Sequence, residues 1–177
     1  MAASHCVSLG MQPLSKARVV AGQLARAGVS VISCPQTNLF LQGRDYDSSP
    51  PRGLTALRAL LDGGVRVAAG GDNLRDPFNP VGRGDPLEVA SLLVTAGHLD
   101  VEEAYRAVSV AARAAMGLPE VRIEAGFPAE LLAIRATSVQ DAVAAASAER
   151  VVVTRGQVVC RTRLIRELPV APRKGDP

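Results

Sequence analysis

Two side chains suited to acid–base or metal chemistry stand just after short apolar runs. His5 follows the opening "MAA" in "SHC", and Asp72 follows "VRVAA" in "GGDN". A third polar stretch, "CPQTN" at 34–38, follows the apolar "VSVIS". In a parallel α/β barrel, side chains at the carboxyl ends of the strands point into the active site. The joint placement favours chemistry, because independent turns need not bring a His and an Asp into register.

Each of these features also has an ordinary structural explanation. An Asp after a strand commonly opens a turn, a lone His is more often a partly buried polar residue, and "CPQTN" reads as a plain loop. The three cysteines are odd in number and form no CxxC pattern, which argues against a disulfide framework and a zinc cluster. We expect Cys6 and Cys34 to be small buried hydrophobic residues.

The elements that must position these side chains alternate along the chain. Ser15 as N-cap and Gly28 as stop predict a helix over 15–28, and "VSVISC" predicts a buried strand. "LTALRALLDGG" and "VRVAA" repeat this order of helix and strand. Strands that alternate with helices predict a parallel sheet built from βαβ units.

Three further helices are predicted from their N-terminal caps, at Asp85, at Asp100 with Glu103, and at Ser138 with Asp141. The second of these should run without interruption to Gly117. "RVVVTRGQVVCRT" then predicts two strands around a glycine turn. This change from helix signals to strand signals indicates a second, smaller β unit.

Composition limits the class of protein. The 177 residues, 47% of them hydrophobic, suffice for one ordinary domain or parts of two. Lys and Arg exceed Asp and Glu by only 20 to 17, and Trp is absent, so nucleic-acid binding has little support. No apolar run approaches the ~18 residues of a membrane span. We expect no membrane partner and a cytoplasmic location.

Several longer stretches resemble a known family. "SHCVSLG", "VISCPQTNLFLQGR", "GGDNLRDPFNPVG" and "IEAGFPAELLAIRA" are similar to the C-terminal part of metal-dependent amidohydrolases, most closely the bacterial cytosine deaminases. The resemblance implies an α/β fold: about the last three βα units of a (β/α)8 TIM-type barrel and part of a small β-sandwich. We expect the barrel part at 1–120, the sandwich part at 121–163 and a disordered tail at 164–177.

The resemblance also implies roles for individual residues. Asp72 would bind a divalent metal, iron or zinc, and accept a proton from metal-activated water, while His5 would contact the substrate and polarise it. Gln42, Asn73 and Phe78 would line the pocket of a pyrimidine-like substrate. The family carries an acidic residue where Asn73 stands, so another cyclic amide or amidine is an alternative substrate class.

Most of the family's metal ligands are missing from this sequence. It has two histidines, no HxH pair, and no counterpart of the family's later metal-binding His and catalytic Glu. We therefore expect weak metal binding by this chain alone. The alternative to an enzyme is an inactive fragment, or an assembly half that needs the missing N-terminal half or a homo-oligomer. A split gene, a decayed gene or a misplaced start codon would each explain Met1 just before "AASHC".

Overall fold

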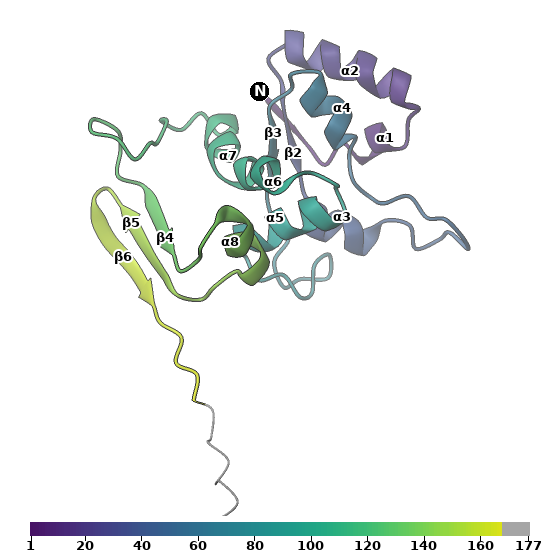
Figure 1. Cartoon of the computed structure of the whole chain (residues 1–177). Coiled ribbons are helices and arrows are strands. Elements are labelled where there is room, and N and C mark those ends of the chain that lie inside the picture. Colours follow the sequence, from purple (N-terminus) through teal and green to yellow (C-terminus); the bar gives the residue numbers. More distant parts are fainter. Residues whose placement is uncertain (168–177) are drawn as a thin grey trace, which may run out of the picture.

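A computed structural model describes residues 1–167, which form an α/β fold with two three-stranded sheets (Figure 1). A disordered tail was predicted at 164–177, and most of it, residues 168–177, lies outside the described residues. The strands are β1 (Ala2–Ser4), β2 (Ser30–Ser33), β3 (Val67–Ala69), β4 (Leu131–Ile134), β5 (Arg150–Thr154) and β6 (Gln157–Thr162). The helices are α1 (Val7–Gly10), α2 (Leu14–Arg26), α3 (Pro35–Leu41), α4 (Leu57–Asp62), α5 (Pro86–Thr95), α6 (Val101–Val108), α7 (Val110–Ala115) and α8 (Val139–Ala145). No described helix combines the length and apolar character needed to span a membrane.

The N-terminal sheet is parallel, with strand order β1-β2-β3, as the alternation of helices and strands predicted. Val31 of β2 and Val67 of β3 are buried, as expected for short β-branched strands covered by helices. Helices α1, α2 and α4 lie to one side of these strands in Figure 1, and α6 and α7 lie to the other. The largest fully buried apolar side chains are Leu60, Leu93 and Val31, so one core joins the sheet to α4 and α5.

The caps at Asp85 and Asp100 are confirmed. The Asp85 carboxylate accepts a hydrogen bond from the Leu87 amide, and Asp100 forms a full capping box with Glu103. Ser138 accepts from the Asp141 amide, but the Asp141 carboxylate accepts from Thr137 instead of completing the box.

Three sequence predictions about helices are wrong. Helix α2 begins after Pro13, whose carbonyl accepts the first helical hydrogen bonds, so Ser15 lies inside the first turn. The predicted helix over 100–117 breaks at Ser109, whose hydroxyl donates to the Tyr105 carbonyl at 2.6 Å, a contact that bends helices. "CPQTN" is not a loop, because Pro35 begins α3 at the position where its missing N–H costs no hydrogen bond.

The second sheet is antiparallel, with order β4-β5-β6 and a bulge between Val152 and Val153. Helix α8 lies between β4 and β5 in the chain and packs against α5 and α6. This sheet stands to one side of the parallel sheet in Figure 1.

A bidentate ion pair ties the second sheet to the first. Arg150 at the start of β5 donates to both carboxylate oxygens of Asp85, at 2.7 and 3.1 Å, and both side chains are about four-fifths buried. Burial opposes the charged form of Asp85, but hydrogen bonds from Arg150 and the Leu87 amide outweigh it and lower the pKa of Asp85. One carboxylate therefore caps α5 and holds β5.

Arg150→Ala should lower the free energy of unfolding by about 1–3 kcal/mol at pH 7, because it removes charged hydrogen bonds from a largely buried carboxylate. The matched control is Arg135→Ala, which breaks a more exposed pair with Glu149 and should cost less than about 1 kcal/mol. Urea unfolding of both variants measures the two values. Equal losses would contradict the role given to Arg150.

The pH dependence of this difference follows from the lowered pKa of Asp85. The carboxylate contributes stability above the ordinary unfolded pKa of about 3.9, and this contribution is lost as the pH falls through the lower folded pKa. The gap between the wild-type chain and Arg150→Ala should therefore shrink below about pH 4. A gap that widens on acidification would contradict this assignment.

Candidate functional site

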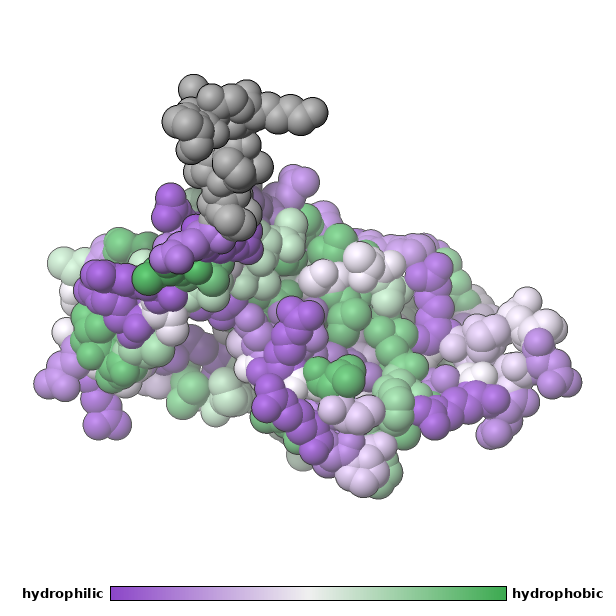
Figure 2. Space-filling view, turned by 90° about the horizontal axis from the view of Figure 1, so that it is seen from below, coloured by the Kyte–Doolittle hydropathy of each residue, from purple (hydrophilic) through white to green (hydrophobic). Residues whose placement is uncertain are grey.

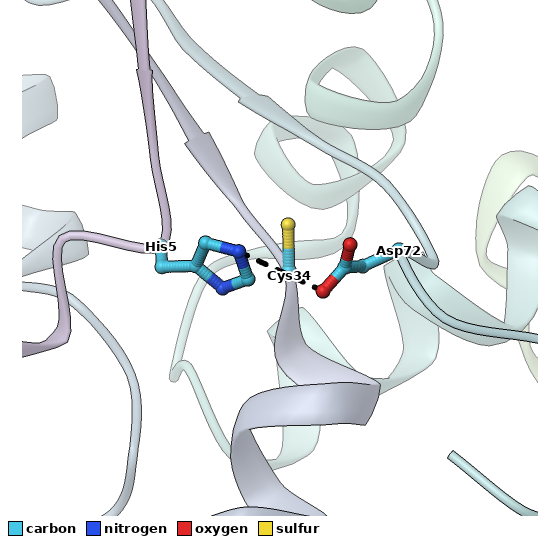
Figure 3. Close-up of side chains that lie close together, drawn as sticks. All are labelled: His5, Cys34 and Asp72. Carbon is cyan, nitrogen blue, oxygen red and sulfur yellow. Dashed lines mark ion pairs between the residues drawn. The ribbon is translucent and has the colours of Figure 1, made fainter. Parts of the chain in front are cut away.

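Three side chains meet where the parallel strands end. His5 follows β1, Cys34 follows β2 and Asp72 lies three residues after β3. Figure 3 shows them facing one another, and their nitrogen, sulfur and oxygen atoms all lie within 4.8 Å of each other. His5 Nε2 is 3.6 Å from Asp72 Oδ2. The parallel register thus brings together the His and the Asp that were singled out from their positions after apolar runs.

The backbone is strained at both ends of this contact. His5, Cys6 and Asp72 have φ values of 62°, 48° and 58°, in the left-handed region that side chains with a Cβ rarely adopt. Such residues cost on the order of 1–3 kcal/mol each and cluster at functional sites.

Asn38 fixes the orientation of the His5 ring. Its buried amide Oδ1 lies 3.0 Å from His5 Nδ1, and an amide oxygen can only accept, so Nδ1 carries the proton and donates. The other ring nitrogen, Nε2, then faces Asp72 Oδ2 at 3.6 Å. A histidine held in this way by a second polar group is typical of a ligand or a catalytic base.

Cys34 is buried beside the pair and is a poor nucleophile. Burial raises the pKa of the Cys34 thiol to about 11, the Asp72 carboxylate adds to this increase, and the His5 backbone amide opposes it. The thiolate is the reactive form of cysteine, so the thiol is largely inert at neutral pH. Cysteine hydrolase chemistry therefore has no support at this site.

Asn73 belongs to a hydrogen-bonded loop. Its Nδ2 donates to Asp76 Oδ2 at 2.5 Å, and its carbonyl accepts from Asn79 Nδ2 at 2.6 Å. Asp76 also accepts from the amides of Phe78 and Asn79. Partial desolvation opposes the charged form of Asp76, but these hydrogen bonds outweigh it and lower its pKa. The loop after β3 thus has a defined shape of its own.

The other two predicted pocket residues are more peripheral. Phe78 is 53% exposed in the same loop, and two further apolar side chains there, Leu74 and Val81, are also exposed. Gln42 is exposed at the end of α3, and its Cβ and Cγ lie close against Gly53. The structure therefore places Asn73 next to the central group, but it does not bring Gln42 into contact with that group in the described part of the chain.

A cavity of about 220 Å³ adjoins Asp72. Gly71, Asp72 and Asn73 line one wall, and Asp85 and Pro86 at the start of α5 line another. Gln36 also lines it and donates to Glu88 of α5 at 2.6 Å. Ligand pockets usually measure about 300–1,000 Å³, so this cavity has the size of part of a pocket.

Comparison with known proteins decides the family. A model described as "Amidohydrolase family" matches residues 2–160. The chain belongs to this family. It is also 35% identical over 164 residues to a pterin deaminase of Rhizobium rhizogenes, a match that covers 90% of this chain and 38% of the relative.

Solved structures of a deaminase and of an aminohydrolase share the fold of this amidohydrolase chain. 5-Methylcytosine deaminase from Klebsiella pneumoniae liganded with phosphonocytosine has a TM-score of 0.83 and 26% identity, over 95% of this chain and 42% of that one. N-isopropylammelide isopropylaminohydrolase from Burkholderia multivorans has a TM-score of 0.77 and 25% identity, over 91% and 39%. The resemblance to cytosine deaminases is thus confirmed, and the chain spans about two fifths of the length of these relatives.

Three neighbours of the site were not assigned roles from the sequence. Cys34, Gln36 and Asn38 all lie in "CPQTN", whose position after a strand was recognised although its helical start was not. The spacing could have indicated that Asn38 lies near Cys34, because Asn38 follows it by one helical turn and lies on the same face of α3.

Alkylation should distinguish the buried thiol from the exposed one. A thiol with a pKa of about 11 carries roughly 100-fold less thiolate near neutral pH than a thiol with the ordinary pKa of about 9. Iodoacetamide at pH 8 should therefore label the exposed Cys160 well before Cys34, as read by peptide mass spectrometry. Labelling of Cys34 at the rate of Cys160 in the folded chain would show that the thiol is not shielded.

Proposed function

We propose that this chain is the C-terminal part of a hydrolytic deaminase that acts on a nitrogen-containing ring. One observation carries the proposal: His5 and Asp72, which resemble functional residues of the family, lie 3.6 Å apart beyond the carboxyl ends of β1 and β3, the two parallel strands that flank β2. The barrel part would comprise residues 1–120, about three βα units, and the small sandwich part residues 121–163.

The residues present fit a divalent cation. An imidazole nitrogen, a carboxylate oxygen and a thiol sulfur converge within 4.8 Å, and all three types of atom are zinc ligands. Asp72 would hold the iron or zinc of the complete enzyme together with ligands from the rest of the barrel. When bound, such an ion lowers the pKa of water and so supplies the nucleophile.

The chain's own residues would orient the substrate and move protons. Asp72 has a second carboxylate oxygen free to accept a proton while the first is engaged. His5 would present Nε2 to the substrate ring, because Nδ1 is already engaged by Asn38. The Asn38 contact would hold the His5 ring in one orientation, which favours chemistry that depends on orientation.

The loop after β3 would form one side of the substrate pocket. Asn73 sits at its base, and Phe78 supplies an exposed aromatic face suited to a flat heterocycle. Gln42 would contribute only if α3 or its substrate shifts. The relatives named for pterin and for 5-methylcytosine both act on heterocyclic amines, which makes a pterin or a pyrimidine the substrate class to test first.

The site would be completed by a partner surface. Among the described strands, β1 and β3 each pair only with β2, so each offers an unpaired edge. The face in Figure 2 shows apolar residues in patches among hydrophilic ones. We propose that the N-terminal part of a complete barrel covers these surfaces, and a second copy is the alternative. Without such a partner the chain would be inactive.

Reconstitution tests this function. In a chimera, this chain replaces the C-terminal part of the Rhizobium pterin deaminase. The chimera should release ammonia from pterin, cytosine or isocytosine. The isolated 177-residue chain is the control: it should release no ammonia, and its content of zinc and iron is measured in parallel. A folded chimera that deaminates none of these compounds, nor creatinine, would defeat the proposal.

Asp72→Asn should lower kcat of the active chimera by at least about 100-fold, since loss of a proton acceptor alone typically costs 10²–10⁴. Asp76→Asn in the same loop is the matched control, because Asp76 orders the backbone and lies outside the metal group. It should change kcat far less. Similar losses in the two variants would show that Asp72 acts only through the loop.

A further inference from the structure

We propose that His5 Nε2, Cys34 Sγ and Asp72 Oδ2 form a thiolate-containing zinc site within this chain. This site differs from the metal site implied by the family resemblance, which uses Asp72 with histidines that the chain lacks. It also does not depend on deaminase activity. It revises the expectation that the chain alone holds metal only weakly, which rested on the small number of histidines.

The first argument is the orientation of the His5 ring. Asn38 Oδ1 lies 3.0 Å from His5 Nδ1, and this contact turns Nε2 toward the Asp72 carboxylate at 3.6 Å. A divalent cation between Nε2 and Oδ2 would bind both atoms, and the Asn38 contact is the usual outer partner of a metal-binding histidine.

The second argument is the size of the group. Tetrahedral zinc, with Zn–N and Zn–O bonds of about 2.0 Å and a Zn–S bond of about 2.3 Å, separates its ligand atoms by about 3.3–3.6 Å. The His5–Asp72 separation of 3.6 Å is within about 0.3 Å of the value for a nitrogen–oxygen pair. The widest separation in the group is at most 4.8 Å, so the ligands need to approach by only about 1 Å.

The third argument is the chemistry of the ligands. A sulfur, an imidazole nitrogen and a carboxylate oxygen together favour zinc over magnesium or calcium, which prefer oxygen ligands only. Cys34 is buried, while Asp72 and His5 are partly exposed, so a metal could approach from their side. Binding would release the thiol proton to solvent and form the Zn–S bond, with water as the fourth ligand. The site would therefore be open on one side.

Cobalt and zinc binding to the 177-residue chain test the proposal. Co²⁺ should give a sulfur-to-cobalt charge-transfer band in the near ultraviolet, and equimolar Zn²⁺ should abolish it. Cys34→Ala should lose this band, whereas Cys160→Ser, which changes an exposed thiol on β6, should retain it. A band that survives Cys34→Ala, or that disappears in Cys160→Ser, would overturn the proposal.

Affinities measured by chelator competition separate ligands from neighbours. His5→Gln and Asp72→Asn should each weaken zinc binding more than about 100-fold, and Asn38→Leu about 10–100-fold, as an outer partner does. Zinc should also raise the urea midpoint of the wild-type chain but not that of Cys34→Ala, with circular dichroism verifying that both are folded. Equal zinc affinity of all variants would show that the site does not exist.

The outcomes also separate this site from the proposed deaminase. A chimera that deaminates its substrate while the isolated chain gives no cobalt–sulfur band would refute the zinc site alone. An isolated chain with the band, in a protein whose folded chimera releases no ammonia, would refute the deaminase alone. The spectroscopic and the kinetic results are therefore independent.

Discussion

The parallel register of β1, β2 and β3 is the constraint on which the rest of the structure depends. Ala2, Ser30 and their neighbours pair so that the three strands run in one direction and end at one edge. His5, Cys34 and Asp72 are separated by tens of residues in the chain, and the register alone brings them together. A slip of one residue would turn each side chain to the other face of the sheet. The buried valines of β2 and β3 make such a slip costly.

The site combines a well-packed sheet and helix with strained backbone at His5 and Asp72. The sheet and α3 are held by a continuous core, and Asn38 reaches the site from the first turns of α3. Against this frame, His5 and Asp72 adopt left-handed conformations that few side chains tolerate. The core stabilises an arrangement that the local backbone disfavours. A less stable sheet would relax this strain, and the two side chains would lose their alignment.

Sequence reasoning predicted the parts of the molecule that depend on local rules. The βαβ alternation, the caps at Asp85 and Asp100 and the meeting of His5 with Asp72 all follow from periodicity, capping and the geometry of parallel strands. It failed where tertiary contacts decide the outcome. The Ser109 hydroxyl breaks a helix that propensity alone would continue, and the burial of Cys34 beside an acid depends on packing between distant strands. The Asn38–His5 contact could be suspected from helical spacing but not assigned.

The Asp85–Arg150 pair has a consequence for how the chain tolerates change. Asp85 lines the cavity beside Asp72, and Arg150 lies at the start of a strand in the other sheet. The wall of the cavity is therefore anchored from the other sheet. Substitutions in β5 can displace that wall without changing a residue that lines the cavity near Asp72. In the proposed deaminase, such substitutions would alter the shape of the substrate pocket, so β5 is a second place to begin when its specificity is changed.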